Sequence, residues 1–346
     1  MTVRWAIVGV GRHVERNVID QMKRAAGGAI VALHSRDRAR GENFAHAHGV
    51  ARVFTDFREI IDDSNIDAIY DASPDGLHAD HAVAASAGRK HILLEKPLAI
   101  SVAEGARALG ARQRHGVTLG VVFNQRHETA HVEARAMIAR DEIGETIYAN
   151  VHIPLISSAP LPASAASWRA DGKMRPGAIA ISIGDHACDT LTFMVGQDIV
   201  EISAFTDATR DNPPNEHCAA MTFKMSGGAN GHASTTSRAP YSRRPFEIHG
   251  TKGSIFIDNS FAYLTNSADI ADTRLTLVNA AGERTLTYPR AECFRLEFEQ
   301  FNRAIAGKGA PATSGAEALR SLAIGAAIYD SVKHGRVAKI SDFLPA

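Results

Sequence analysis

The first third of the chain alternates between short apolar runs and longer helical patterns. Apolar, often β-branched runs occupy residues 3–8, 30–33, 67–70, 90–94 and 117–122, and helical patterns such as 80–87 and 102–114 separate them. Strands that alternate with helices of this length predict βαβ crossovers and a parallel sheet. Because the runs are almost continuously apolar, we expect these strands to be buried on both faces.

A glycine-rich turn follows the first of these runs. Gly9 and Gly11 stand where a dinucleotide-binding fold needs a tight turn and close approach of the backbone to a pyrophosphate, and Arg12 and His13 lead into the next helix. The full G-x-G-x-x-G pattern has a small residue three positions after Gly11, where this chain has Val14. The position of the motif between a strand and a helix therefore favours dinucleotide binding more than the motif itself does.

The residues after the second run indicate which dinucleotide binds. NAD sites usually carry Asp or Glu near the end of this strand, whereas an arginine accommodates a 2′-phosphate. Here Ser35 and Arg36 follow the strand and Arg40 lies close behind, and a guanidinium can pair with a phosphate through two hydrogen bonds. Asp37 argues against this interpretation unless it caps the next helix, and a basic first turn of a surface helix is the alternative. The pattern favours NADP(H).

Glu95-Lys96-Pro97 ends the fourth apolar run. Ligands of open parallel sheets bind outside the carboxyl ends of the strands, so Lys96 is placed for chemistry on a bound cofactor. In isolation the same residues would be a solvated loop lysine and a proline that stops a strand. The surrounding pattern favours a functional lysine.

The pattern changes after residue 123. A helix is expected over 129–140 and a strand over 146–153, followed by β-rich runs from about 200 to 286 and by helices over 293–306 and 316–334. This order predicts an α+β domain with a large, predominantly antiparallel open sheet. We expect residues 1–123 to form the NADP-binding domain and residues 124–346 a substrate-binding and oligomerisation domain. The stretch 157–176, which contains Trp168 and Arg169, is long enough to suggest a functional lid.

A single helix is expected over residues 181–194. Within it, Ser182, Asp185, His186 and Asp189 have i, i+3, i+4 and i+7 spacing and therefore share one face. That face could line a substrate site, and a polar face at a domain interface is the alternative.

In their order along the chain, these pieces resemble the glucose–fructose oxidoreductase/inositol dehydrogenase (Gfo/Idh/MocA) family over essentially the whole length. The matching segments are residues 9–11, 67–74 with His78, 90–97, 168–169, His186 with 189–191, and 247–254. The resemblance implies a Rossmann domain followed by an α+β domain. Its sheet would carry the substrate site on one side and usually the oligomer interface on the other.

The resemblance and the chemistry of hydride transfer together assign roles to residues. Lys96 is the expected proton donor and electrostatic catalyst, with His186 beside the same oxygen. Family members usually place Asp where this chain has Ser182. The expected cofactor contacts are Gly9, Gly11, Arg12, His13, Ser35, Arg36, Arg40, Ser73, Pro74, His78, Glu95, Lys96 and Asn124. The expected substrate contacts are Lys96, Arg126, Trp168, Arg169, Ser182, Asp185, His186 and Asp189.

The implied activity is NADP-dependent hydride transfer to or from a sugar, an anhydrosugar or a cyclic polyol. A dehydrogenase of inositols or trans-dihydrodiols is one alternative. A non-catalytic cofactor- or sugar-binding regulator on the same fold is the other, because fold does not fix function. Lys96 and His186 favour catalysis, whereas Ser182 in place of Asp leaves the regulator open.

Composition excludes several other classes of function. Lys plus Arg equals Asp plus Glu at 38 each, which gives no electrostatic attraction to nucleic acid or membranes. No apolar segment reaches transmembrane length, no signal peptide precedes the first strand, and three dispersed cysteines suggest the reducing cytoplasm. The 16 histidines form no cluster with the spacing of a zinc site, so no metal is expected.

Overall fold

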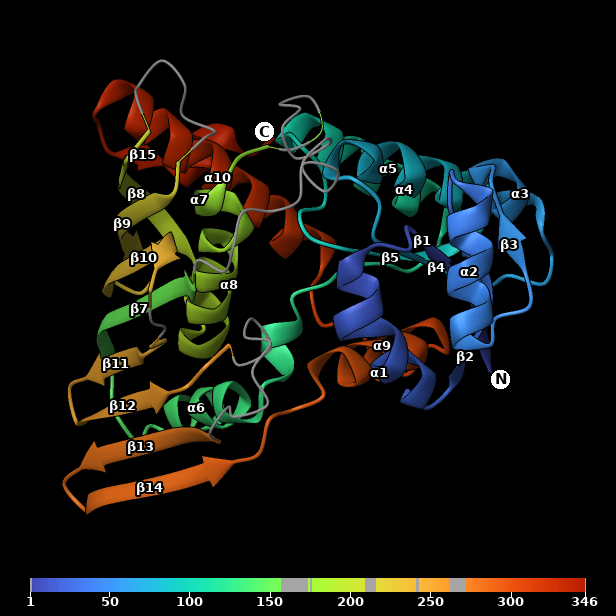
Figure 1. The fold of residues 1–346 in the computed structure, drawn as a ribbon. Coiled ribbons are helices and arrows are strands. Elements are labelled where there is room, and N and C mark those ends of the chain that lie inside the picture. Colours follow the sequence, from blue (N-terminus) through green and yellow to red (C-terminus); the bar gives the residue numbers. More distant parts are fainter. Residues whose placement is uncertain are drawn as a thin grey trace.

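A computed structural model of the chain describes residues 2–156, 174, 176–208, 216–240, 243–261 and 272–345. Two β-sheets dominate this part of the chain (Figure 1). A six-stranded sheet is built from the first third of the sequence, and a nine-stranded sheet from the rest. The two-part α/β and α+β architecture expected from the sequence is confirmed.

The six-stranded sheet is parallel throughout, in the order β3-β2-β1-β4-β5-β6. Its strands are β1 (Val3–Val8), β2 (Gly28–His34), β3 (Val53–Phe54), β4 (Ala68–Asp71), β5 (His91–Leu94) and β6 (Leu119–Val121). Every residue of β4 is buried, as expected for a strand covered on both faces. The order reverses between β1 and β4, and ligands of such sheets bind at the carboxyl ends of the strands near that point.

Helices connect these strands. They are α1 (Ile19–Arg24), α2 (Arg38–His48), α3 (Phe57–Asp62), α4 (His78–Ala87) and α5 (Val102–His115). The sequence carries the end signals of α5, because the Ser101 side chain accepts a hydrogen bond from the Glu104 N–H and Gly116 ends the helix at φ +66°. The two-residue strand β3 and the six-residue helix α3 were not predicted, since elements this short show no hydrophobic periodicity.

The helix after the glycine turn begins differently from the expected α-helix. Residues 14–18 form a π-helical turn, η1 (Val14–Val18), before α1 starts at Ile19. Val14 occupies the position where the dinucleotide motif has a small residue, and its side chain is buried in the core. Single π-helical turns of this kind are rare and are frequent at functional sites.

The nine-stranded sheet has the order β14-β13-β12-β11-β7-β10-β9-β8-β15. Its strands are β7 (Thr146–Ile156), β8 (Ile199–Thr206), β9 (Cys218–Met225), β10 (Asn230–Ala239), β11 (Phe246–Gly250), β12 (Gly253–Asp258), β13 (Thr273–Asn279), β14 (Gly282–Tyr288) and β15 (Ala338–Lys339). β7 and β10 pair in parallel, and the other pairs that the structure describes are antiparallel. The prediction of a predominantly antiparallel sheet is therefore confirmed.

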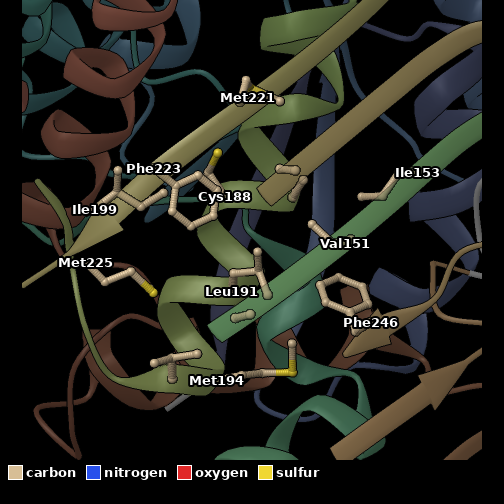
Figure 2. Close-up of a cluster of buried hydrophobic side chains, with 14 of the residues drawn as sticks. Val151, Ile153, Cys188, Leu191, Met194, Ile199, Met221, Phe223, Met225 and Phe246 are labelled. Carbon is tan, nitrogen blue, oxygen red and sulfur yellow. The ribbon is translucent and has the colours of Figure 1, made fainter. Parts of the chain in front are cut away.

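One face of this sheet is packed against helices. These are α6 (Thr129–Ala139), α7 (Ile179–Ser182), α8 (Gly184–Val195) and α10 (Gly315–His334). Figure 1 shows α7 and α8 on the side of the sheet that faces the first domain, and Figure 2 shows Leu191 of α8 among side chains of β7, β9 and β11 such as Val151, Phe223 and Phe246. Buried and exposed residues alternate along β9, which is the pattern of a strand with one face in the core.

The single helix expected over residues 181–194 is wrong. The chain leaves the α-helical region at Ile183, with φ −124° and ψ −38°, so that α7 ends at Ser182 and α8 begins at Gly184. Glycine and β-branched isoleucine both have low helix propensity, which makes this pair a weak point in the helical pattern. Ser182 therefore does not share a continuous helix face with Asp185, His186 and Asp189.

Two helices from the end of the chain also cover the first sheet. Phe298 and Phe301 of α9 (Cys293–Ile305) pack on Trp5 of β1, with ring centroids 5.4 and 5.6 Å away. The indole N–H of Trp5 donates to Asn302 Oδ1 at 3.0 Å in the buried interior. Leu322 of α10 packs in the core on the other side of this sheet. The expected boundary at residue 123 remains a prediction, and the C-terminal segment contributes to both cores.

Candidate active site

The carboxyl ends of β1, β2, β4, β5 and β6 bring the sequence-predicted cofactor residues to one edge of the first sheet. Gly9 has φ +90°, and a Cβ atom added there would lie 2.6 Å from the Ala72 carbonyl oxygen. A Cβ on Gly11 would meet nothing within 4 Å. The first glycine therefore permits the tight turn, and the second leaves open space above the backbone. This cradle fits a pyrophosphate at the start of the following helix.

Ser35 and Asp37 shape the turn after β2. The buried Ser35 hydroxyl donates to the Asp37 carbonyl oxygen at 2.8 Å, and the Asp37 carboxylate accepts from the Arg40 N–H at 3.1 Å. Asp37 is therefore the N-cap of α2, as one interpretation of the sequence required. The side chains of Arg36 and Arg40 are exposed, and no ion pair holds either of them among the described residues.

Glu95 is a partly buried carboxylate directly beside the predicted catalytic lysine. Its Oε1 accepts from the Tyr70 hydroxyl at 2.7 Å and lies 3.1 Å from His13 Nε2. Burial alone would raise the pKa of Glu95, but His13, Tyr70 and the Lys96 charge together hold it below its usual range. Glu95 is therefore an ionised anchor that ties the end of β5 to β4 and to the glycine turn.

Lys96 reaches from the first sheet to the helices of the second. Its Nζ donates to the Ser182 carbonyl oxygen at 2.7 Å, at the break between α7 and α8. Ser182, which stands where family members usually have Asp, thus contacts Lys96 through its backbone carbonyl group and not through its side chain. No signal in the sequence distinguishes a backbone contact from a side-chain contact.

His186 lies one turn into α8, close to this lysine. Its ring is buried, and Phe123 and Phe261 approach it edge-on at centroid distances of 6.0 and 6.1 Å. Burial, followed by the positive charges of Lys96 and His13, lowers the pKa of His186 well below its ordinary value. The imidazole is therefore neutral at neutral pH.

Ser73 and His78 belong to a buried hydrogen-bond network below this edge. His78 Nδ1 lies 2.7 Å from the Pro97 carbonyl oxygen, and its Nε2 lies 3.1 Å from the Ser73 carbonyl oxygen. Asp71 accepts from the Ser73 N–H at 2.9 Å and pairs with His81 at 2.8 Å. His78 is fully buried and joins the loops after β4 and β5, which places it behind the expected cofactor surface.

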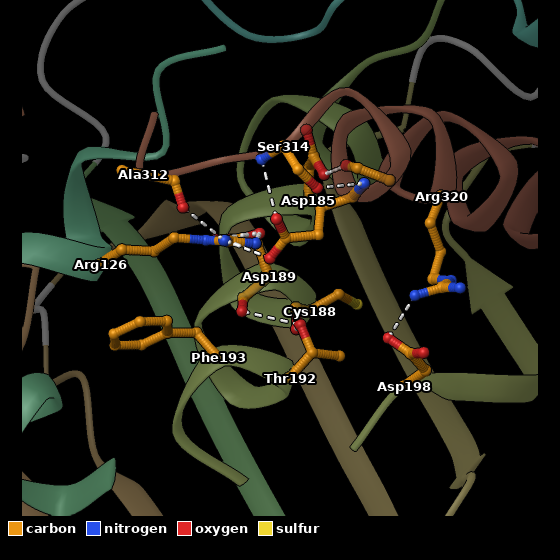
Figure 3. A network of polar contacts seen from close by, with 12 residues as sticks. Arg126, Asp185, Cys188, Asp189, Thr192, Phe193, Asp198, Ala312, Ser314 and Arg320 are labelled. Atoms are coloured by element: carbon orange, nitrogen blue, oxygen red, sulfur yellow. Dashed lines mark hydrogen bonds and ion pairs between the residues drawn. The ribbon is translucent and has the colours of Figure 1, made fainter. Parts of the chain in front are cut away.

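Arg126 and Asp189, both predicted to bind substrate, bind each other. Arg126 lies on the 3-10 turn η3 (Asn124–His127), and its Nη2 and Nε reach the Asp189 carboxylate at 2.6 and 3.0 Å (Figure 3). The third nitrogen of its guanidinium donates to the Ala312 carbonyl oxygen at 2.9 Å and to Glu317 at 2.5 Å. Burial alone would lower the pKa of Arg126, but Asp189 and Glu317 raise it. With its donors occupied in this way, the pair holds η3, α8 and α10 together.

Asp185 lies on the same face of α8, four residues before Asp189. Its carboxylate accepts a short hydrogen bond from the Ser321 hydroxyl, and it lines a polar cavity of about 190 Å³ between α8 and α10. Burial raises the pKa of Asp185 to about 6, while Lys96, Ser321 and Arg126 oppose the rise and Asp189 adds to it. Asp185 is therefore a carboxyl group that titrates close to neutral pH.

The remaining sequence-predicted residues are placed as follows. Gly9, Gly11, Arg12 and His13 follow β1, Ser73 and Pro74 follow β4, and the buried Asn124 begins η3 after β6. Trp168 and Arg169 lie outside the described residues. Within the described part of the chain, no group of three or more His, Cys, Asp or Glu side chains could hold a metal ion.

Sequence reasoning missed the residues that support the predicted ones. These are Tyr70, Asp71, His81, Phe123, Phe261, Glu317 and Ser321. Tyr70, Asp71 and Phe123 lie in or directly after strands whose carboxyl ends carry the site, and that position is a usable signal. His81 lies on α4, and Phe261, Glu317 and Ser321 come from segments far along the chain, so no local pattern connects these four to Lys96.

Comparisons with known proteins match the chain in both of its parts. A family model described as an oxidoreductase family with an NAD-binding Rossmann fold matches residues 3–123, and the GFO/IDH/MocA C-terminal domain matches residues 131–256. The 1,5-anhydro-D-fructose reductase of Ensifer adhaerens is 29% identical over 340 residues, which cover 97% of this chain and 98% of that protein. The scyllo-inositol 2-dehydrogenase (NAD(+)) of Bacillus subtilis is 25% identical, with 96% and 95% covered.

Solved structures show the same fold. An oxidoreductase domain protein from Kribbella flavida superposes with a TM-score of 0.85 at 23% identity, covering 98% of this chain and 100% of that one. A levoglucosan dehydrogenase solved with NADH and levoglucosan has the same TM-score and identity, with the same coverage.

Proposed function

This chain belongs to the Gfo/Idh/MocA oxidoreductase family, and on that premise we propose that it is an NADP-dependent oxidoreductase. Its reaction is hydride transfer between nicotinamide and a carbonyl or secondary alcohol of a sugar, an anhydrosugar or a cyclic polyol. The observation that carries this proposal is the 2.7 Å contact of Lys96 Nζ with the Ser182 carbonyl oxygen. It brings the lysine at the carboxyl end of β5 to the end of α7, directly before α8, the helix that carries His186.

The chain supplies proton transfer and charge stabilisation at the reacting oxygen. Bound NADP(H) would supply or accept the hydride. As a carbonyl is reduced, negative charge develops on its oxygen, and the Lys96 ammonium both stabilises that charge and provides the proton. In oxidation Lys96 takes the alcohol proton instead. His186 is neutral, so one ring nitrogen can donate to the same oxygen while the other accepts.

The turn after β2 supports NADP(H) over NAD(H). Asp37, the acidic residue nearest the end of this strand, uses its carboxylate to cap α2. Arg36 and Arg40 are exposed beside it and can pair with a 2′-phosphate. The Bacillus subtilis relative is described as NAD-dependent, so the preference is specific to these residues of this chain.

The sugar-like substrate class follows from the relatives. The Ensifer adhaerens protein acts on an anhydro-ketose, and the Bacillus subtilis protein acts on an inositol. Both substrates are polyhydroxylated carbonyls or alcohols. We assign 1,5-anhydro-D-fructose or a related ketose as the first candidate, and an inositol as the second.

We further propose that the enzyme acts in the cytoplasm on small molecules, as a homo-oligomer. Cys188, Cys218 and Cys293 are free thiols, as expected in a reducing compartment. No helix in the described ranges is long and apolar enough to cross a membrane.

A single set of titrations and rate measurements tests this proposal. NADPH should bind roughly ten- to a hundredfold more tightly than NADH, the usual value of a charge-assisted bidentate contact, and Arg36→Ala should weaken NADPH selectively. A panel of ketoses, anhydrosugars and inositols, followed by nicotinamide absorbance, should identify a substrate. With it, Lys96→Met should lower kcat by roughly a hundredfold or more while NADPH binding changes little.

Two outcomes contradict the proposal. If NADH binds as tightly as NADPH, Arg36 does not pair with the 2′-phosphate and the preference for NADP(H) is wrong. Tight cofactor binding without turnover of any compound in the panel favours the non-catalytic regulator.

A further inference from the structure

A backbone turn of unusual conformation lies next to His186. Asn259 and Phe261, which follow β12, have φ angles of +59° and +56°. Asparagine adopts this left-handed region with some ease, but a bulky residue such as phenylalanine rarely does. Such conformations persist only where surrounding contacts hold them, and they concentrate at functional sites.

Two side chains, those of His131 and Arg244, hold this turn in place. The buried His131 ring lies 2.8 Å from the Gln125 carbonyl oxygen through Nδ1 and 2.5 Å from the Ser260 hydroxyl through Nε2. Burial lowers the pKa of His131 to about 4, so the neutral ring donates to Gln125 and accepts from Ser260. Arg244 donates to the Phe261 carbonyl oxygen at 3.0 Å.

The Phe261 side chain is fixed by a ring stack and directed at His186. Its ring stacks on Phe246 of β11 at a centroid distance of 5.7 Å and an angle of 7°. The same ring meets His186 edge-on at 6.1 Å and 74°, while Phe123, which follows β6, meets His186 at 6.0 Å and 80°. His186 thus contacts two aromatic rings, one from the segment after β6 and one from the segment after β12.

We propose that Phe261 is a positioning residue that, together with Phe123, fixes the His186 ring plane and keeps water away from it. This inference rests on the proposed function of His186. The left-handed turn serves that role, because it directs the ring of a residue beyond the end of β12 back toward α8. Among the residues that the structure describes, the charges that act on His186 are those of Lys96 and His13, and neither aromatic ring adds one.

The proposal is tested by the titration of His186, which needs no substrate. In protein labelled with 13C-histidine, the His186 signal is identified by its loss in His186→Gln. Phe261→Ala should let water reach the ring. Because burial lowers the pKa of His186 in the intact protein, this variant should raise that pKa by about one pH unit or more. Phe261→Leu, which refills the space, should restore most of the wild-type behaviour. Once a substrate is known, Phe261→Ala should lower kcat roughly tenfold with little change in KM.

Phe223→Ala is the matched control. Phe223 of β9 is buried in the same core, so this change also removes one phenyl ring, but from a strand that does not lead into the turn. It should cost similar stability and leave the pKa of His186 unchanged. If Phe261→Ala does not fold, Ser260→Ala loosens the turn without removing a ring and should shift the titration in the same direction, by less.

Two results overturn the proposal. The first is an unchanged His186 titration in Phe261→Ala, or in Ser260→Ala if Phe261→Ala does not fold. The second is an equal shift in Phe223→Ala, which would mean that any loosening of the core has this effect. If the protein turns over no substrate, the proposed function is wrong. The pKa of His186 in Phe261→Ala still decides whether Phe261 shields the His186 ring from water.

Discussion

At the scale of single residues, Asp185 is notable because its ionisation opposes folding. Burial raises its pKa from the ordinary value of 3.8 to about 6 in the folded protein, so the native state favours the protonated form. The native state then holds a proton that the unfolded chain has already lost between these two values. The free energy of unfolding is therefore not reduced by Asp185 below about pH 4, and it declines as the pH rises from there through about 6.

Asp185→Asn should accordingly stabilise the protein at pH 8 but not at pH 4. The amide keeps a hydrogen-bond acceptor for Ser321 and removes the cost of a buried charge, which we expect to be worth roughly 1–3 kcal/mol. Urea unfolding of both proteins across this pH range measures the difference. Ser321→Ala should act in the opposite direction, with its largest cost at pH 8. A pH-independent difference for Asp185→Asn would show that the carboxyl group does not titrate in this range.

At the scale of elements, the ion pair of Arg126 with Asp189 joins parts of the chain that are far apart in sequence. Asp189 is 63 positions from Arg126, and Glu317 is 191 positions from it. Glu317 also completes the capping box that starts α10 with Ser314. The sequence indicated that α8 has a polar face and that Arg126 follows the last strand of the first sheet. It could not show that they meet, because no local pattern reports a partner on another element.

Asp189→Asn should destabilise the protein more than it weakens substrate binding. Removing one partner of a buried ion pair leaves the other charge uncompensated, and we expect a loss of about 2–4 kcal/mol in the free energy of unfolding, measured in urea. Asp198→Asn is the control, because its pair with Arg320 at 2.6 Å is partly exposed and should be worth less than about 1 kcal/mol. A stable Asp189→Asn protein with a strongly raised KM would instead support the substrate role predicted from the sequence.

At the scale of the whole molecule, one face of the nine-stranded sheet carries none of the helices that the structure describes. Ile202 and Ala204 of β8 point into the core, so Phe205 points to the opposite face, where its side chain is 76% exposed. Tyr148 of β7 lies on the same open face. The sequence predicted a strand over 146–153 and β-rich runs over about 200–286, but not the order of the strands or the parallel pairing of β7 with β10. Alternation reports which side of a strand is buried and not which strand lies beside it.

Phe205→Glu should weaken self-association of the protein. An exposed apolar face on a sheet favours burial against a second copy, and a charge on that face opposes the burial. Light scattering after gel filtration should show a larger particle for the wild type than for the variant. Val132→Glu, which changes an exposed residue of α6 on the helical side, should leave the particle size unchanged. A monomeric wild type contradicts this prediction.

The packing of α9 on Trp5 also has a consequence for how the protein is made. The ribosome releases the chain from its N-terminus, and β1 emerges long before Phe298 and Phe301, the residues that cover one side of it. The first sheet must therefore remain incompletely buried during most of translation, with an apolar surface that the final helices cover. A nascent chain halted before residue 293 would be a target for chaperones, although all six strands of its cofactor domain are complete.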